Sequence, residues 1–147
     1  MGNLFDPEFG PVVALGPFYV ANLDTNLTNT DLLLAGITAE TLTPNLPSAG
    51  TIVGISVAPS ATPSAGSAVF SIHSASTELA NTPTVTISSA ANTLGGYDLA
   101  GSAGEVAFSA GARLGVSATT TTTLAATTVD YRAYIWVRFD RRGLATA

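Results

Sequence analysis

Few residues in this chain could do chemistry, and His73 is the first to consider. It is the only histidine and cysteine is absent, which excludes zinc sites built from several histidines or from thiolates. His73 follows Ser71 at a spacing of two, on the polar side of an alternating pattern, so we expect it to be exposed. A hydrolytic triad needs a nucleophile, a base and an acid that orients the base, and the spacing around His73 indicates none. The sequence therefore predicts that the protein is not an enzyme.

Other motifs for catalysis or ligand binding are missing too. The sequence contains neither the Gly-x-Ser-x-Gly nucleophile motif nor a phosphate-binding loop. Calcium takes several oxygen ligands from neighbouring positions, and only Asp6 and Glu8 lie within one short loop. We predict no metal and no cofactor.

The segment VDYRAYIWVRF (129–139) carries the side chains best suited to contact another protein. Its odd positions are apolar and predict the buried face of a strand. Its even positions then point outward, and they are Arg132, Tyr134, Trp136 and Arg138. Tyr, Trp and Arg are enriched where protein interfaces bind most strongly. We predict a contact between subunits here; the alternative is that the Arg side chains simply cover the two rings on a solvated sheet.

Alternation of apolar and polar residues predicts the strands that position this segment. In the first run, Val53, Ile55 and Val57 are expected to face inward. Segments rich in Gly, Pro and Ser separate the runs and indicate turns, and weaker runs at 17–23, 31–37 and 95–100 raise the strand number to about eight. The pattern predicts an all-β fold, an antiparallel β-sandwich of the jelly-roll type. The six stronger runs are Ile52–Ala58, Ser67–Ser74, Thr84–Ser88, Glu105–Ser109, Arg113–Ala118 and Val129–Phe139.

The first 49 residues have a different character. They contain five prolines, which interrupt helices and strand ladders, together with a cluster of aromatic side chains. We expect residues 1–49 to be an extended arm that docks on partners, residues 50–140 to be the jelly-roll domain and residues 141–147 to be a short basic tail. The aromatic residues predicted to dock the arm are Phe5, Phe9, Phe18 and Tyr19.

Charge is sparse and uneven along the chain. Charged residues make up 10% of the sequence, against roughly 25% in typical soluble domains, which suggests a surface covered by partners or by other copies. Residues 1–128 hold one arginine against eight acids, a net charge of −7, and residues 129–147 hold four arginines against two acids. The acidic body argues against binding to nucleic acid or to an anionic membrane, because both need clustered cations. No apolar run is long enough for a transmembrane helix, and no signal peptide is evident, so we expect synthesis in a host cytoplasm.

The segment from residue 49 to 139 resembles a domain found in virions of tailed bacteriophages, in capsid decoration (cement) proteins, head fibres and some tail-tip proteins. The resemblance is carried by GTIVGISV, AVFSIHSAS, PTVTISSAANT, EVAFSAGARLGVSATTTT and VDYRAYIWVRF, and FSAGARLGV is the element most like the family. It implies a jelly roll that trimerises about a three-fold axis, and it implies no catalytic residues.

Together these features predict a structural virion protein. We expect a homotrimer that binds the major capsid protein on the outer surface of a phage head and stabilises the shell. The alternative is a module of a head fibre or tail tip that recognises host-surface glycans, although Tyr97 is the single aromatic residue that the sequence places outside the arm and the stronger strands. A secreted adhesin would need a signal peptide.

Overall fold

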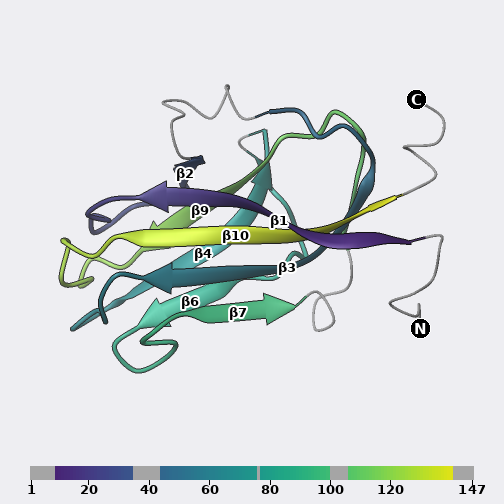
Figure 1. The fold of residues 1–147 in the computed structure, drawn as a ribbon. Coiled ribbons are helices and arrows are strands. Elements are labelled where there is room, and N and C mark those ends of the chain that lie inside the picture. The colour runs from purple at the N-terminus through teal and green to yellow at the C-terminus, as the bar shows by residue number, and fades with distance from the viewer. Residues whose placement is uncertain (1–8, 35–43, 76, 100–105, 141–147) are drawn as a thin grey trace.

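The computed structural model describes residues 9–34, 44–75, 77–99 and 106–140, and these form antiparallel strands (Figure 1). The predicted all-β fold is confirmed, and none of the described residues forms a helix that could cross a membrane. The strands are β1 (Phe9–Val20), β2 (Thr30–Leu34), β3 (Gly50–Pro59), β4 (Ser67–Ser74), β5 (Thr77–Glu78), β6 (Val85–Ser88), β7 (Gly96–Leu99), β8 (Val106–Phe108), β9 (Leu114–Thr120) and β10 (Tyr131–Asp140).

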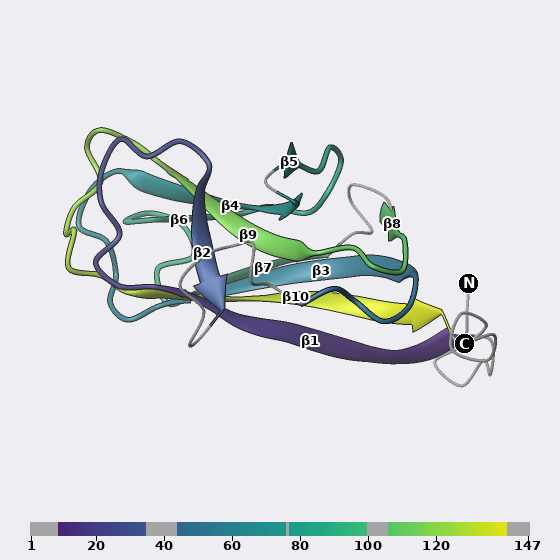
Figure 2. The same ribbon diagram turned by 90° about the horizontal axis from the view of Figure 1, so that it is seen from above.

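The strands make two layers that face each other, as Figure 2 shows from above. Layer A contains β1, β10, β3 and β7, hydrogen-bonded in that order, with β8 also paired to β3. Layer B contains β2, β9 and β4, with β5 and β6 paired to β4. Pairing of β1 with β2 joins the two layers along one side. The result is an antiparallel sandwich of the jelly-roll type.

The core between the layers is built from the inward positions of each strand. On β10, the odd positions from Tyr131 to Val137 are at most 1% exposed, as the alternation predicts. On β4, Phe70 and Ile72 are fully buried, and the Phe70 ring lies 5.1 Å from that of Tyr131 across the core. This packing fixes which side chains β10 presents to solvent.

In β3 the inward positions differ from the prediction. Ile52 is fully buried and Val53 is only partly buried, whereas Ile55 and Val57 face the core as expected. The cause is a β-bulge: Trp136 pairs with Gly54 but Val137 pairs with Ile52, so Val53 is the extra residue. A bulge shifts the alternation by one residue, which returns Ile52 to the inner face.

The expected boundary between residues 49 and 50 is wrong for the described part of the N-terminal segment. β1 pairs with β10 from Phe9 to Val20, and Phe18 is 2% exposed within the core. Pro11 and Pro17 fall in the two irregular stretches of this pairing, where a missing N–H interrupts no regular ladder. The prolines therefore mark bulges in a strand, not a detached arm.

Residues 1–8, which include Phe5, and residues 141–147 lie outside the described residues, and for Phe9 only the backbone is described.

Threonines at the end of β9 tie the β1–β2 loop to the same domain. The Thr120 hydroxyl donates to the carbonyl of Asp24 at 2.8 Å and accepts the N–H of Leu27 at 2.9 Å. The Thr119 hydroxyl accepts the N–H of Asn29 at 3.1 Å. Residues 9–34 are thus part of the sandwich through main-chain pairing, core packing and loop hydrogen bonds.

Candidate functional site

The outer face of layer A carries the row of side chains that the sequence singles out on β10. The inward odd positions turn Arg132, Tyr134, Trp136 and Arg138 to the opposite face. Arg132 and Trp136 are exposed, and Tyr134 and Arg138 are partly buried. The predicted orientation of these four side chains is confirmed; their contact with a partner stays a prediction.

Trp136 lies at the centre of this face between small neighbours. It pairs with Ala14 of β1 on one side and with Gly54 of β3 on the other. The indole Nε1–H donates to the Ser56 hydroxyl at 2.9 Å, and 38% of the side chain is exposed. The one polar atom of the indole is therefore satisfied within the chain, and what remains exposed is apolar ring surface.

Strand β7 extends this apolar surface to the edge of the layer. Tyr97 pairs with Ser56 and Leu99 pairs with Gly54, so both lie in the rows that run through Tyr134 and Trp136. Tyr97 is 76% exposed and Leu99 is 58% exposed. We name Tyr134, Trp136, Tyr97 and Leu99 the docking patch. The sequence did not predict that Leu99 belongs to it, because strand order cannot be read from local patterns.

Arginines border the docking patch along β10. Arg132 and Arg138 lie two residues before Tyr134 and two residues after Trp136, on the same face. Exposed apolar patches bordered by polar residues mark interaction sites, and Arg is favoured over Lys at such sites because its planar head stacks on rings and pairs with carboxylates. The arrangement has the composition of a protein interface.

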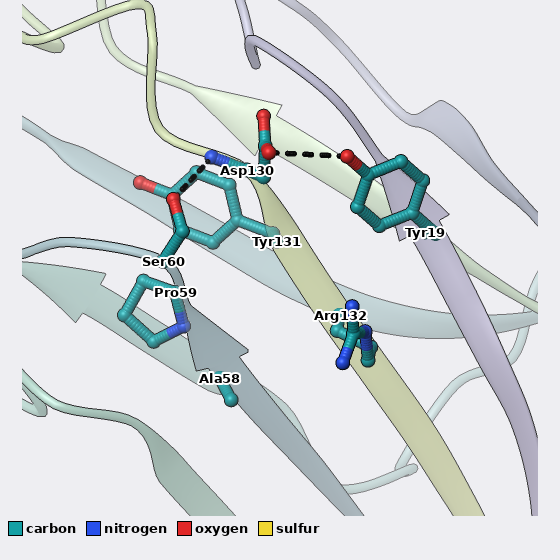
Figure 3. Close-up of a pocket in the computed structure, with 7 residues that line it drawn as sticks. All are labelled: Tyr19, Ala58, Pro59, Ser60, Asp130, Tyr131 and Arg132. Atoms are coloured by element: carbon teal, nitrogen blue, oxygen red, sulfur yellow. Dashed lines mark hydrogen bonds between the residues drawn. The ribbon is translucent and has the colours of Figure 1, made fainter.

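Beyond Arg132, a cavity of about 240 Å³ opens at the end of the same face (Figure 3). It is bounded by the ends of β1 and β3 and the start of β10. Tyr19 and Arg132 flank it on one side, and Ala58 and Pro59 lie on the other. The full lining is Tyr19, Ala58, Pro59, Ser60, Asp130, Tyr131 and Arg132.

Asp130 is the most connected residue of this cavity. Its carboxylate accepts the Tyr19 hydroxyl at 3.1 Å and the Asn22 N–H at 2.9 Å, and its own N–H donates to the Ser60 hydroxyl at 2.9 Å. The hydrogen bond to Asp130 raises the pKa of Tyr19, with smaller contributions from burial and from the Asp130 charge. The sequence placed Tyr19 in an arm; the structure brings it to Asp130, across 111 positions of the chain.

His73 is buried, contrary to the expectation that it is exposed. It is 2% exposed, and its Nε2 lies 3.0 Å from Asp31 Oδ1 on β2. Ser71 is also buried, and its hydroxyl pairs with that of Ser117 at 3.2 Å. Ser71 and His73 thus each contact a side chain on another strand. The described residues contain no cluster of three or more possible metal ligands.

Comparison with known proteins gives no relative for this chain: no family model, no curated protein and no solved structure matches it.

Proposed function

We propose that this protein is a structural subunit that works in an assembly and docks through the docking patch. The observation that carries the proposal is the environment of Trp136, whose ring surface is exposed while its N–H already donates to Ser56. When a partner covers this ring, the indole N–H gives up no hydrogen bond to water, because it already donates to Ser56. Burial of the ring is then favourable through its apolar area, at roughly 25 cal/mol per Å².

The assembly that we propose is a phage head, on which the protein decorates the outer shell as a trimer. The resemblance of residues 49–139 to virion decoration domains supports this assignment, as does a chain that is only 10% charged. Arg132 and Arg138 also favour an acidic partner, and the first 128 residues of a second copy carry a net charge of −7. The role is structural and involves no catalytic step.

Sedimentation equilibrium tests self-association directly. The wild-type protein should reach the mass of a trimer, either alone or when bound to purified phage heads. Trp136→Ala should weaken association by about 2 kcal/mol, which is about thirtyfold. Leu94→Ala is the matched control, because Leu94 is 88% exposed but precedes β7 and lies outside the docking patch.

The proposal fails if the wild-type chain remains monomeric at every concentration and also ignores purified heads. It fails equally if Leu94→Ala and Trp136→Ala weaken association to the same extent, because the patch would then have no special role. Circular dichroism of each variant verifies that the β-sandwich is retained.

A further inference from the structure

The cavity beside Arg132 contains a carboxylate and a guanidinium that do not pair with each other. Asp130 and Arg132 both line it, and no ion pair between these two side chains is found among the described residues. Their separation leaves an acceptor and a donor on the wall of one cavity.

Asp130 is held in place before any ligand arrives. Its two carboxylate oxygens accept one hydrogen bond each, from the Tyr19 hydroxyl and from the Asn22 N–H. A carboxylate has about four acceptor positions, so acceptor capacity remains on both oxygens. The backbone of Asp130 is also fixed, because the Ser60 N–H donates to its carbonyl at 2.8 Å. The acceptor is thus preorganised, which lowers the entropic cost of binding.

The rest of the lining supplies donors and apolar walls. The Arg132 guanidinium carries five N–H donors and makes no hydrogen bond or ion pair within the described residues. The Tyr19 ring stands beside it, and Pro59 and Ala58 form the opposite side (Figure 3). A ligand for this site therefore needs hydroxyls that both donate and accept, on a body with apolar C–H surface.

We propose that this cavity binds one neutral pyranose residue, either free or at the end of a glycan. Vicinal hydroxyls of the sugar donate to Asp130 and accept from Arg132, while a C–H face of the ring lies on Tyr19. A simple anion is repelled by Asp130 and a simple cation by Arg132, so a neutral polyol fits the pair best. The volume of about 240 Å³ is below the usual 300–1,000 Å³ of drug-sized sites, which suits one ring rather than several.

This site is separate from the docking patch. Arg132 lies one row beyond Tyr134, and Tyr19 is on β1, away from Tyr97 and Leu99 on β7. Arg132 borders the docking patch and also lines the cavity, so the two proposals are told apart at residues that they do not share, Trp136 for docking and Tyr19 for the cavity. If the Trp136→Ala variant no longer associates but still binds the sugar, that result supports the sugar site. Self-association is tested by the sedimentation experiment above.

Two-dimensional ¹H–¹⁵N NMR titration of the full chain tests the site. The probes are the methyl glycosides of glucose, galactose and mannose, with acetate and ethylammonium as charged comparisons. At least one glycoside should give saturable shifts at the amides of Asn22, Ser60, Asp130 and Arg132. Arg132→Gln should weaken this binding about tenfold, as expected for loss of a hydrogen bond from a charged group.

Two tyrosine variants complete the test. Tyr19→Ala should weaken binding about tenfold, whereas Tyr19→Phe retains the ring and should bind nearly as well as wild type. Leu94→Ala is the control, since Leu94 is exposed and lies outside both the cavity and the docking patch, and the affinity of this variant for the glycoside should not change. Absence of saturable shifts with all three glycosides would overturn the proposal. Tighter binding of acetate or ethylammonium, or binding unaffected by Arg132→Gln, would overturn it as well.

Discussion

Gly115 lies directly against the imidazole of His73, on the strand that separates His73 from Asp31. A Cβ at residue 115 would come within 2.7 Å of His73 Nε2, which no folded protein tolerates without movement. The missing side chain lets the imidazole cross β9 and reach the carboxylate on β2. One glycine thus allows a side-chain contact between β4 and β2, which do not pair directly.

Gly115→Ala should lower the free energy of unfolding by about 1–3 kcal/mol, the usual cost of inserting a methyl group into filled space. Urea denaturation measures the change. The matched comparison is the same substitution in a His73→Ala background, where the space is open and alanine should cost little. An equal penalty in both backgrounds would show that the imidazole is not the obstacle.

Phe18→Ala should lower the free energy of unfolding by about 3–5 kcal/mol, as for other buried phenylalanines. The reason is that Phe18 belongs to the core rather than to a partner-binding arm. Val12→Ala on the same strand is the control; Val12 is 42% exposed, so its loss should matter far less. A Phe18→Ala protein with wild-type stability in the absence of partners would restore the arm interpretation.

Stability should fall at alkaline pH because of two tyrosines. The pKa of Tyr19 is raised above 10.0 chiefly by its hydrogen bond to Asp130, and burial raises that of Tyr131. The folded protein holds these protons more tightly than the unfolded chain, so their contribution is fully present below pH 10 and is lost as the pH rises above it. Urea midpoints measured across this range should decrease, and Tyr19→Phe should reduce the decrease. A midpoint that stays constant or rises through this range would contradict the assignment.

Local alternation was sufficient to predict much of the fold and the outward face of β10. The odd positions of β10 are buried as expected, among them Tyr131, Ala133 and Ile135. Their burial turns the side chains of Arg132, Tyr134 and Trp136 to the outer face. The same reasoning went wrong at Val53, because a bulge depends on the partner strand and leaves no local signal.

The other errors arose because strands that are far apart in the sequence pack against each other in the fold. His73 falls on the polar side of the alternation in β4, yet it is buried. Gly115 on β9 leaves room for its ring, and Asp31 on β2 pairs with it. Pro11 and Pro17 were interpreted as breaks, but strand pairing with β10 continues past both. The cavity around Asp130 joins three segments far apart in sequence, and only the tertiary fold brings them together.

The most direct test of docking through layer A is the fluorescence of Trp136, the only tryptophan in the chain. Its emission spectrum is recorded over a dilution series and again with purified phage heads added. Because 38% of the side chain is exposed in the single chain, assembly through the docking patch should shift the emission to shorter wavelength, with the same concentration dependence as the mass. An emission maximum that does not move while the protein assembles would contradict the proposed interface.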